Sequence, residues 1–282
     1  MIKKSVISLI AYDAHLLPNS IKSYYPFVDE IILALDKDRI SWSGNTFEFN
    51  ENLLWKTLKT IDIKNKIHLV EADFHSSKIP IENDNFTRNY AKAQCSHDWI
   101  FSFDADEVLV NPKEFFIDFL PLCEKYYKDT ELLMTWFHPY KQLKMKNPNT
   151  HELLDHTLMI CNNDGTFNRT EQQGFACSKD STFTYCRWTN KKRRILTNLA
   201  IMHYSFCRNE KELEQKLSNY GHSTERGEDP FMHNWKLINE TNYTQLRNFK
   251  THKYGGGQWE KLMPIPTQHL MTFAKEQTGM IL

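Results

Sequence analysis

Three carboxylates end one apolar stretch of this chain, and their type and spacing are suited to holding a divalent cation. Residues 98–103 read Asp-Trp-Ile-Phe-Ser-Phe, a run typical of a buried strand, and Asp104, Asp106 and Glu107 follow it. Carboxylates are costly to bury without a compensating charge. Side chains two residues apart on an extended chain point to the same side, so Asp104 and Asp106 are expected to share one face. Two such oxygen donors suit Mg²⁺ or Mn²⁺ carrying a phosphorylated ligand, although an isolated Asp-x-Asp is more often an acidic turn.

The elements that must position these acids follow a simple alternation in the first 110 residues. Apolar runs alternate with amphipathic segments, starting and ending on a strand. Strands are expected over residues 5–11, 30–35, 67–70 and in the run 98–109, and helices over 16–25, 53–61 and 86–97. Continuous apolar strands separated by helices predict an α/β fold with a mostly parallel central sheet flanked by helices on both faces.

Several polar residues fall at the ends of these expected strands. In parallel α/β sheets, ligands bind beyond the carboxyl ends of the strands, where Tyr12 and Asp36 join the acidic run. Arg88 lies on the helix ahead of the acidic strand, and its guanidinium is suited to contact a phosphate or a nucleobase. Each has a simpler alternative: a surface tyrosine, a turn-initiating aspartate and a surface ion pair, respectively. Their convergence on one edge is stronger evidence than any one of them.

The second half of the chain is less regular. Strands are expected over residues 132–137, 157–161 and 195–204, and helices over 113–127 and 209–220. The glycines at 255–257, next to Trp259, suit either a mobile lid or an ordinary turn. There is no internal repeat and no obvious linker, so a single domain over residues 1–282 is expected.

Composition narrows the classes of partner. The 282 residues include 35 basic and 35 acidic side chains, and this balance gives no electrostatic footprint for nucleic acid. The six cysteines form no Cys-x-x-Cys pair and are expected to be reduced thiols of a cytoplasmic protein. No segment approaches the roughly 20 apolar residues that span a bilayer. A membrane would therefore be reached only peripherally.

The order of the motifs resembles that of family 2 glycosyltransferases, which have the GT-A fold. Residues 88–91 read Arg-Asn-Tyr-Ala, and the strand led by Trp99 carries Asp-Ala-Asp-Glu at 104–107. Such sequences characteristically show an Arg-Asn-x-Ala helix just before a strand of this kind. The resemblance covers roughly residues 1–110 and, later, the His-Tyr-Ser at 203–205. It implies a GT-A-like domain in which residues 1–110 bind a nucleotide-sugar and residues 111–282 bind the acceptor and supply a C-terminal lid.

The resemblance also implies roles for particular residues. Asp104 and Asp106 would hold Mn²⁺ or Mg²⁺ against the diphosphate of a UDP- or GDP-sugar, with His203 as a further metal ligand. Arg88 and Asp36 would contact the donor, as would Asp104 if it binds ribose or metal-bound water. Tyr12 is placed to stack on the nucleobase. For His203, a satisfied histidine near an apolar strand is an equal alternative, and Glu107 is expected to have a structural role.

An inverting transferase also needs a general base for the acceptor hydroxyl. The base is expected between the metal strand and His203, where Asp155, Glu171 and Asp180 are candidates. Glu171 is preferred because its surroundings, Arg-Thr-Glu-Gln-Gln-Gly, suggest a polar loop over the site. Any one of the three is more often a plain surface acid.

The function predicted from the sequence is therefore metal-dependent transfer of a sugar, with inversion, to a glycan or lipid-linked acceptor. One alternative is a sugar-phosphate nucleotidyltransferase, which usually carries a glycine-rich basic loop after its first strand. Residues 11–15 instead read Ala-Tyr-Asp-Ala-His, which argues against that class. The other alternative is a catalytically degenerate GT-A-like binding protein, which the intact Asp-x-Asp disfavours.

Overall fold

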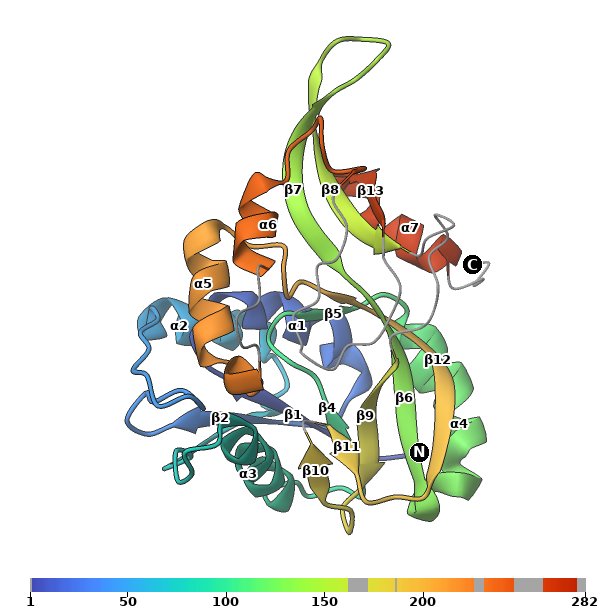
Figure 1. Ribbon diagram of the computed structural model, residues 1–282. Helices are drawn as coiled ribbons and strands as arrows, with labels where there is room; N and C mark the ends of the chain where they lie inside the picture. The colour runs from blue at the N-terminus through green and yellow to red at the C-terminus, as the bar shows by residue number, and fades with distance from the viewer. Residues whose placement is uncertain (1, 162–171, 186, 226–230, 246–260, 278–282) are drawn as a thin grey trace.

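A large mixed sheet forms the centre of the computed structural model, which describes residues 2–161, 172–185, 187–225, 231–245 and 261–277 (Figure 1). Its eight strands run in the order β3-β2-β1-β4-β9-β6-β12-β5. They span β1 Lys4–Ile10, β2 Glu30–Asp36, β3 Ile67–Ala72, β4 Trp99–Ser102, β5 Glu107–Leu109, β6 Thr130–Phe137, β9 Gln172–Ser178 and β12 Arg193–His203. The pairs β1–β2, β2–β3, β1–β4 and β6–β12 are parallel, and the pairs that involve β9 or β5 are antiparallel. The predicted α/β class with a mostly parallel sheet is confirmed.

Alternate residues of β1 build the two faces of the sheet. Val6 and Ile10 pack into the large core cluster that includes Leu17 of α1, whereas Ile7 packs into a second cluster with Ala91 of α3. The helices of this half are α1 Leu17–Tyr24, α2 Glu51–Ile61 and α3 Pro80–Ala93. Because side chains alternate along a strand, a strand buried on both faces requires helices on both sides, as the sequence predicts.

The second half adds a smaller three-stranded sheet in the order β13-β8-β7. The β7–β8 hairpin projects from the body of the molecule, and α5 and α6 lie beside it (Figure 1). These elements span β7 Pro139–Lys146, β8 Leu153–Cys161, β13 Lys261–Pro266, α5 Glu210–Asn219, α6 Phe231–Leu237 and α7 Leu270–Gln277, and a two-stranded pair is formed by β10 Phe183–Tyr185 and β11 Trp188–Thr189. Leu213 and Leu217 of α5 pack against Tyr140 and Phe231, so α5 is anchored by its apolar face.

Three details differ from the sequence expectations. The run 98–109 is two strands, β4 and β5, which lie apart in the sheet, so Asp104 and Asp106 lie in a turn. The expectation that they share one face of an extended strand is therefore wrong. Helix α3 begins at Pro80, earlier than expected, because proline is well suited to the first turn of a helix.

The helix expected over 113–127 is instead split into three segments. These are a π-helical stretch Glu114–Phe119, α4 Leu120–Cys123 and a 3₁₀ stretch Glu124–Asp129. Pro121, at the start of α4, lacks the N–H that a regular helix would use, which accounts for the interruption. Among the described residues, no helix is long and apolar enough to cross a membrane.

Candidate functional site

The acidic turn lies beyond the carboxyl end of β4, and its backbone is fixed from three directions. Glu107 N donates to Asp104 O at 3.1 Å and closes the turn. Ser20 Oγ of α1 donates to Asp104 O at 3.1 Å, and Tyr204 N, just after β12, donates to Asp106 O at 2.9 Å. The two aspartate side chains are thereby held at the edge of the sheet where ligands of α/β proteins bind.

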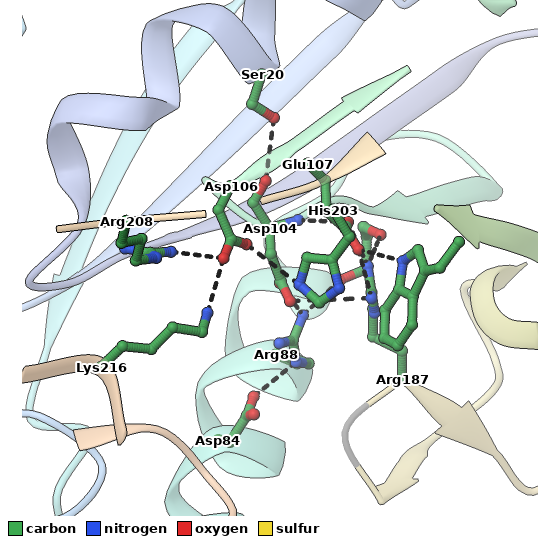
Figure 2. A network of polar contacts seen from close by, with 12 residues as sticks. Ser20, Asp84, Arg88, Asp104, Asp106, Glu107, Arg187, His203, Arg208 and Lys216 are labelled. Atoms are coloured by element: carbon green, nitrogen blue, oxygen red, sulfur yellow. Dashed lines mark hydrogen bonds and ion pairs between the residues drawn. The ribbon is translucent and has the colours of Figure 1, made fainter. Parts of the chain in front are cut away.

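Asp104 faces two guanidinium groups (Figure 2). Arg88 Nη1 lies 2.9 Å from Asp104 Oδ1, and Arg187 Nη2 lies 3.9 Å from Oδ2. Arg88 is itself held by Asp84 Oδ1 at 2.6 Å and Ser102 Oγ at 2.8 Å. Burial opposes the charged form of Asp104, but Arg88 and Arg187 outweigh it and lower the pKa of Asp104 to about 2. Asp104 is thus an ionised carboxylate in an internal network.

Glu107 is the most enclosed acid of the turn. Its side chain is fully buried, and Arg187 donates to both of its oxygens, at 2.6 and 2.8 Å. Trp136 Nε1 donates to Oε1 at 2.7 Å, and Asp104 N donates to Oε2 at 2.9 Å. A bidentate guanidinium–carboxylate pair with further hydrogen bonds is a stable internal brace. The structural role expected for Glu107 agrees with these contacts.

Asp106 has different neighbours, which come from the later part of the chain. Its Oδ2 accepts from Arg208 Nη2 at 2.6 Å and from Lys216 Nζ of α5 at 2.7 Å. Its Oδ1 lies 3.5 Å from His203 Nε2 at the end of β12. Figure 2 shows Arg208 and Lys216 on one side of Asp106 and His203 on the other. Burial opposes ionisation, but Lys216, His203 and Arg208 hold the pKa of Asp106 well below its ordinary value.

Asp106 and His203 fit the protein share of a divalent-cation site. One carboxylate oxygen and one imidazole nitrogen face each other, while the other carboxylate oxygen is fixed by two cations. In the described part of the chain, no three His, Cys, Asp or Glu side chains gather as a complete metal cage would require. Magnesium is commonly bound by one or two protein groups together with substrate phosphates and water, so a two-ligand arrangement suits a metal that arrives with its ligand. The ligand roles of Asp104, Asp106 and His203 stay predictions.

The other predicted donor contacts lie at the same edge but are already engaged. Asp36 accepts hydrogen bonds from the backbone N–H groups of Asp38, Ile40 and Phe74, at 3.0, 3.0 and 2.8 Å, and so shapes the loop after β2. Tyr12 is only 7% exposed and packs into the main core cluster. Burial, with Asp13 nearby, raises the pKa of Tyr12 well above its usual value, so it stays a neutral phenol. Contact of either residue with a nucleoside stays a prediction.

The structure does not bring Asp180 to the acidic turn. Strand β9 runs antiparallel to β4 with Ser178 opposite Trp99, so Asp180 lies at the opposite edge of the sheet. Its side chain is 73% exposed and pairs with Lys191 at 3.3 Å. Asp155 is exposed on the projecting hairpin. Asp180 as a catalytic base is therefore a wrong prediction.

Two other predictions fall outside the described residues. One is Glu171, the preferred catalytic base. The other is the lid expected around 255–259. No base is assigned.

Sequence reasoning missed four charged residues of the site. Arg187 and Arg208 are isolated charges in irregular stretches and carry no periodic signal. Asp13, which pairs with Arg208 at 2.8 Å, was recognised only as the end of a strand. Lys216 had a usable signal, because it falls on the apolar face of the helix expected over 209–220. A lysine on such a face needs an acidic partner or a ligand.

Comparisons with known proteins give partial structural likenesses only. No protein-family model matches the chain, and no curated protein matches it. The structure of S. aureus TarS 1-349 is similar with a TM-score of 0.31 and 15% identity, over 54% of this chain and 38% of that one. A glucosyl-3-phosphoglycerate synthase from Mycobacterium tuberculosis, in complex with Mn²⁺, UDP-Glc and phosphoglyceric acid, gives 0.31 and 18%, over 48% of this chain and 43% of that one.

A third structure belongs to a different class of enzyme. 4-Diphosphocytidyl-2C-methyl-D-erythritol synthase gives a TM-score of 0.34 and 11% identity, over 62% of this chain and 74% of that one. The chain therefore spans less than half the length of the TarS and synthase structures. At these scores the likeness carries no argument about function, which rests on this chain's own contacts.

Proposed function

We propose that this chain is a glycosyltransferase that moves a sugar from a UDP- or GDP-sugar to an acceptor hydroxyl. The observation that carries the proposal is the environment of Asp106. One of its carboxylate oxygens faces His203 Nε2, and the other is bound by Arg208 and Lys216, at the carboxyl edge of the central sheet. An acid–imidazole pair beside two cations matches the chemistry of a metal-bound diphosphate.

Within this proposal, Asp106 and His203 hold Mn²⁺ or Mg²⁺. The cation, when bound, offsets the negative charge that develops on the departing nucleoside diphosphate. Arg208 and Lys216 fix Asp106 Oδ2 and so orient the carboxylate. Asp104 and Arg88 shape the neighbouring wall, where the ion pair between them, at 2.9 Å, fixes the carboxylate toward the donor side.

The nucleoside would occupy the ends of β1 and β2. A small hollow there is lined by Ala11, Asp36, Trp42 and Thr87, among other residues. Trp42 Nε1 donates to Thr87 Oγ1 at 3.2 Å, so α3 and the loop after β2 are tied together at this place. Stacking by Tyr12 and a polar contact from Asp36 belong to the same proposal.

The division of labour between the two halves is part of the proposal. Residues 1–110 supply the donor side, and residues 111–282 supply the acceptor side and a C-terminal lid over one domain. A glycan or a lipid-linked sugar is the acceptor, and transfer proceeds with inversion, as the sequence resemblance implies. A lipid-linked acceptor would bring the protein to a membrane surface peripherally.

A sugar-phosphate nucleotidyltransferase is the competing function, and the loop after β1 disfavours it. That class needs donors for a triphosphate after its first strand. In this chain the position holds Asp13, whose carboxylate pairs with Arg208 at 2.8 Å. An acid beside the phosphate path repels a triphosphate, which supports sugar transfer over nucleotidyl transfer.

The direct test is a panel of UDP- and GDP-sugars incubated with the protein and Mn²⁺, read as release of the nucleoside diphosphate. We expect at least one donor to be hydrolysed slowly, and Asp106→Asn to abolish that release. Asp180→Asn is the matched control, because Asp180 lies at the far edge of the sheet and is exposed. Failure of every donor, with pyrophosphate release from a nucleoside triphosphate and a sugar 1-phosphate, would overturn the proposal in favour of nucleotidyl transfer.

A further inference from the structure

The buried ammonium of Lys216 has fewer partners than its chemistry requires. Its side chain is 10% exposed, and Asp106 Oδ2 is its hydrogen-bond partner within the described part of the chain. An ammonium group carries three N–H donors, and burying unmatched donors is costly. Arg208 competes for the same oxygen at 2.6 Å. One carboxylate oxygen thus serves two cations, which leaves donor capacity directed at the site.

The helix that carries Lys216 is held firmly in place. Asn209 and Glu212 form a reciprocal capping box at its start, and Leu213 and Leu217 anchor its apolar face. Lys216 lies between these two leucines in sequence and is buried with them. A charge held by a capped and packed helix is pre-organised, so a ligand that meets it pays little ordering entropy.

The far end of the same helix is tied to the donor half. Ser41 Oγ donates to Asn219 Oδ1 at 2.7 Å, and Asn45 Nδ2 donates to Ser218 O at 3.3 Å. Ser41 also lines the hollow at the ends of β1 and β2. Lys216 therefore lies on α5 between the hollow proposed for the nucleoside and the carboxylate proposed for the metal.

From this placement we infer that Lys216, assisted by Arg208, binds the donor diphosphate directly, in addition to any contact through a metal. The inference rests on the proposed function, because it assigns a second set of ligands to the same diphosphate. In the free protein Asp106 Oδ2 holds the two cations together. When the nucleoside diphosphate binds, the remaining N–H donors of Lys216 bond to its phosphate oxygens and stabilise the departing charge.

The test measures binding rather than turnover. Affinities for UDP and GDP are determined by calorimetry, once with saturating Mn²⁺ and once in EDTA, and Mn²⁺ affinity alone is read by electron paramagnetic resonance. Lys216→Met should lower nucleotide affinity by about 10- to 100-fold in both conditions, as expected for loss of a charge-assisted hydrogen bond. Its Mn²⁺ affinity should change less than that of Asp106→Asn.

Two further variants keep the test decisive. Lys216→Gln retains a donor for Asp106 but loses the charge, and it should show the same loss, whereas Lys216→Arg should recover most of the affinity. Lys211→Met, on the exposed face of the same helix, is the matched control and should bind like the wild type.

The possible failures can be told apart. Unchanged nucleotide affinity in Lys216→Gln would overturn the inference, as would a loss confined to Mn²⁺ affinity. A wild-type protein that binds neither UDP nor GDP with Mn²⁺ would instead overturn the proposed function itself.

Discussion

Asp104 and Asp106 are two residues apart in the same turn, yet they belong to two different networks. Asp104 joins Arg88 and Arg187, which are also bound to Asp84 and to Glu107. Asp106 joins Arg208, Lys216 and His203, all from the last third of the chain. The first network ties α3 and the segment after β10 to the turn, and the second ties α5 and β12 to it. An acid pair in sequence is thus not one unit in chemistry.

The difference teaches which charges are braces and which are available. In the Asp104 network, Glu107 and Arg187 satisfy one another through two short hydrogen bonds in the interior. In the Asp106 network, one oxygen serves two cations while the other faces an imidazole at 3.5 Å. We therefore expect mutations of the first network to lower stability and mutations of the second to lower ligand binding.

The largest expected effect on stability is that of Glu107→Ala. It leaves the guanidinium of Arg187, whose side chain is 2% exposed, without its bidentate partner. Removing one member of a buried ion pair costs about 3–5 kcal/mol of the free energy of unfolding. Urea unfolding measures this loss. Lys216→Met should cost less, because Asp106 keeps Arg208 as a partner.

A surface acid provides the control for this comparison. Asp38 is 60% exposed and lies 3.8 Å from Lys37, so Asp38→Ala should change the free energy of unfolding by no more than about 0.5 kcal/mol. If Glu107→Ala were as mild as Asp38→Ala, the description of the Asp104 network as an internal brace would fail.

The second effect is a pH dependence that Asp104 contributes. Its folded-state pKa is about 2 against an ordinary value of 3.8, which corresponds to about 2 kcal/mol of stabilisation when the group is ionised in both states. Because the folded pKa is the lower one, this contribution is fully present above about pH 4 and is lost as the pH falls toward 2. Asp104→Asn removes the titration. The difference in free energy of unfolding between wild type and this variant should therefore shrink from pH 5 to pH 3 in urea titrations.

The same experiment on Asp106→Asn sharpens the contrast. The pKa of Asp106 lies well below its ordinary value, with Lys216, His203 and Arg208 as the causes that oppose burial. Its contribution should therefore persist to lower pH than that of Asp104. Equal profiles for the two variants would contradict the separation of the two networks.

The smallest expected effect is that of Asn209→Ala. The Asn209 side chain accepts from Glu212 N at 2.9 Å and caps α5, the helix that carries Lys216. Loss of such a cap costs about 1 kcal/mol. Because Leu213 and Leu217 still anchor the helix, nucleotide affinity should fall only slightly. A loss of affinity as large as that of Lys216→Met would show that the cap, rather than the ammonium, controls the site.

The donor half could be predicted from sequence because its signals are local. The apolar runs that became β1 and β2 and the amphipathic segments that became α1 and α2 were expected within a few residues of their observed bounds. Alternation of continuous strands and helices then fixes a parallel sheet and its ligand-binding edge. The acidic turn was found for the same reason, since three carboxylates after an apolar run stand out in any reading.

The remaining site residues could not be predicted because their partners are distant in sequence. Arg187 contacts Glu107 across 80 positions, and Lys216 contacts Asp106 across 110. Strands β7, β9 and β13 were missed because their sequences are short or mixed, and tertiary pairing decides them. The break between β4 and β5 is also a tertiary effect, since β5 pairs with β12. Asp180 was misplaced because the direction of β9 is invisible in its sequence.

The central claim, that Asp106 rather than Asp104 holds the donor diphosphate, is tested most directly by calorimetry. UDP and GDP are titrated into wild type, Asp106→Asn and Asp104→Asn with saturating Mn²⁺. The account predicts that Asp106→Asn lowers the affinity of the nucleotide that binds by about 100-fold or more, and Asp104→Asn by about tenfold or less. A loss in Asp104→Asn that equals or exceeds that in Asp106→Asn would contradict it.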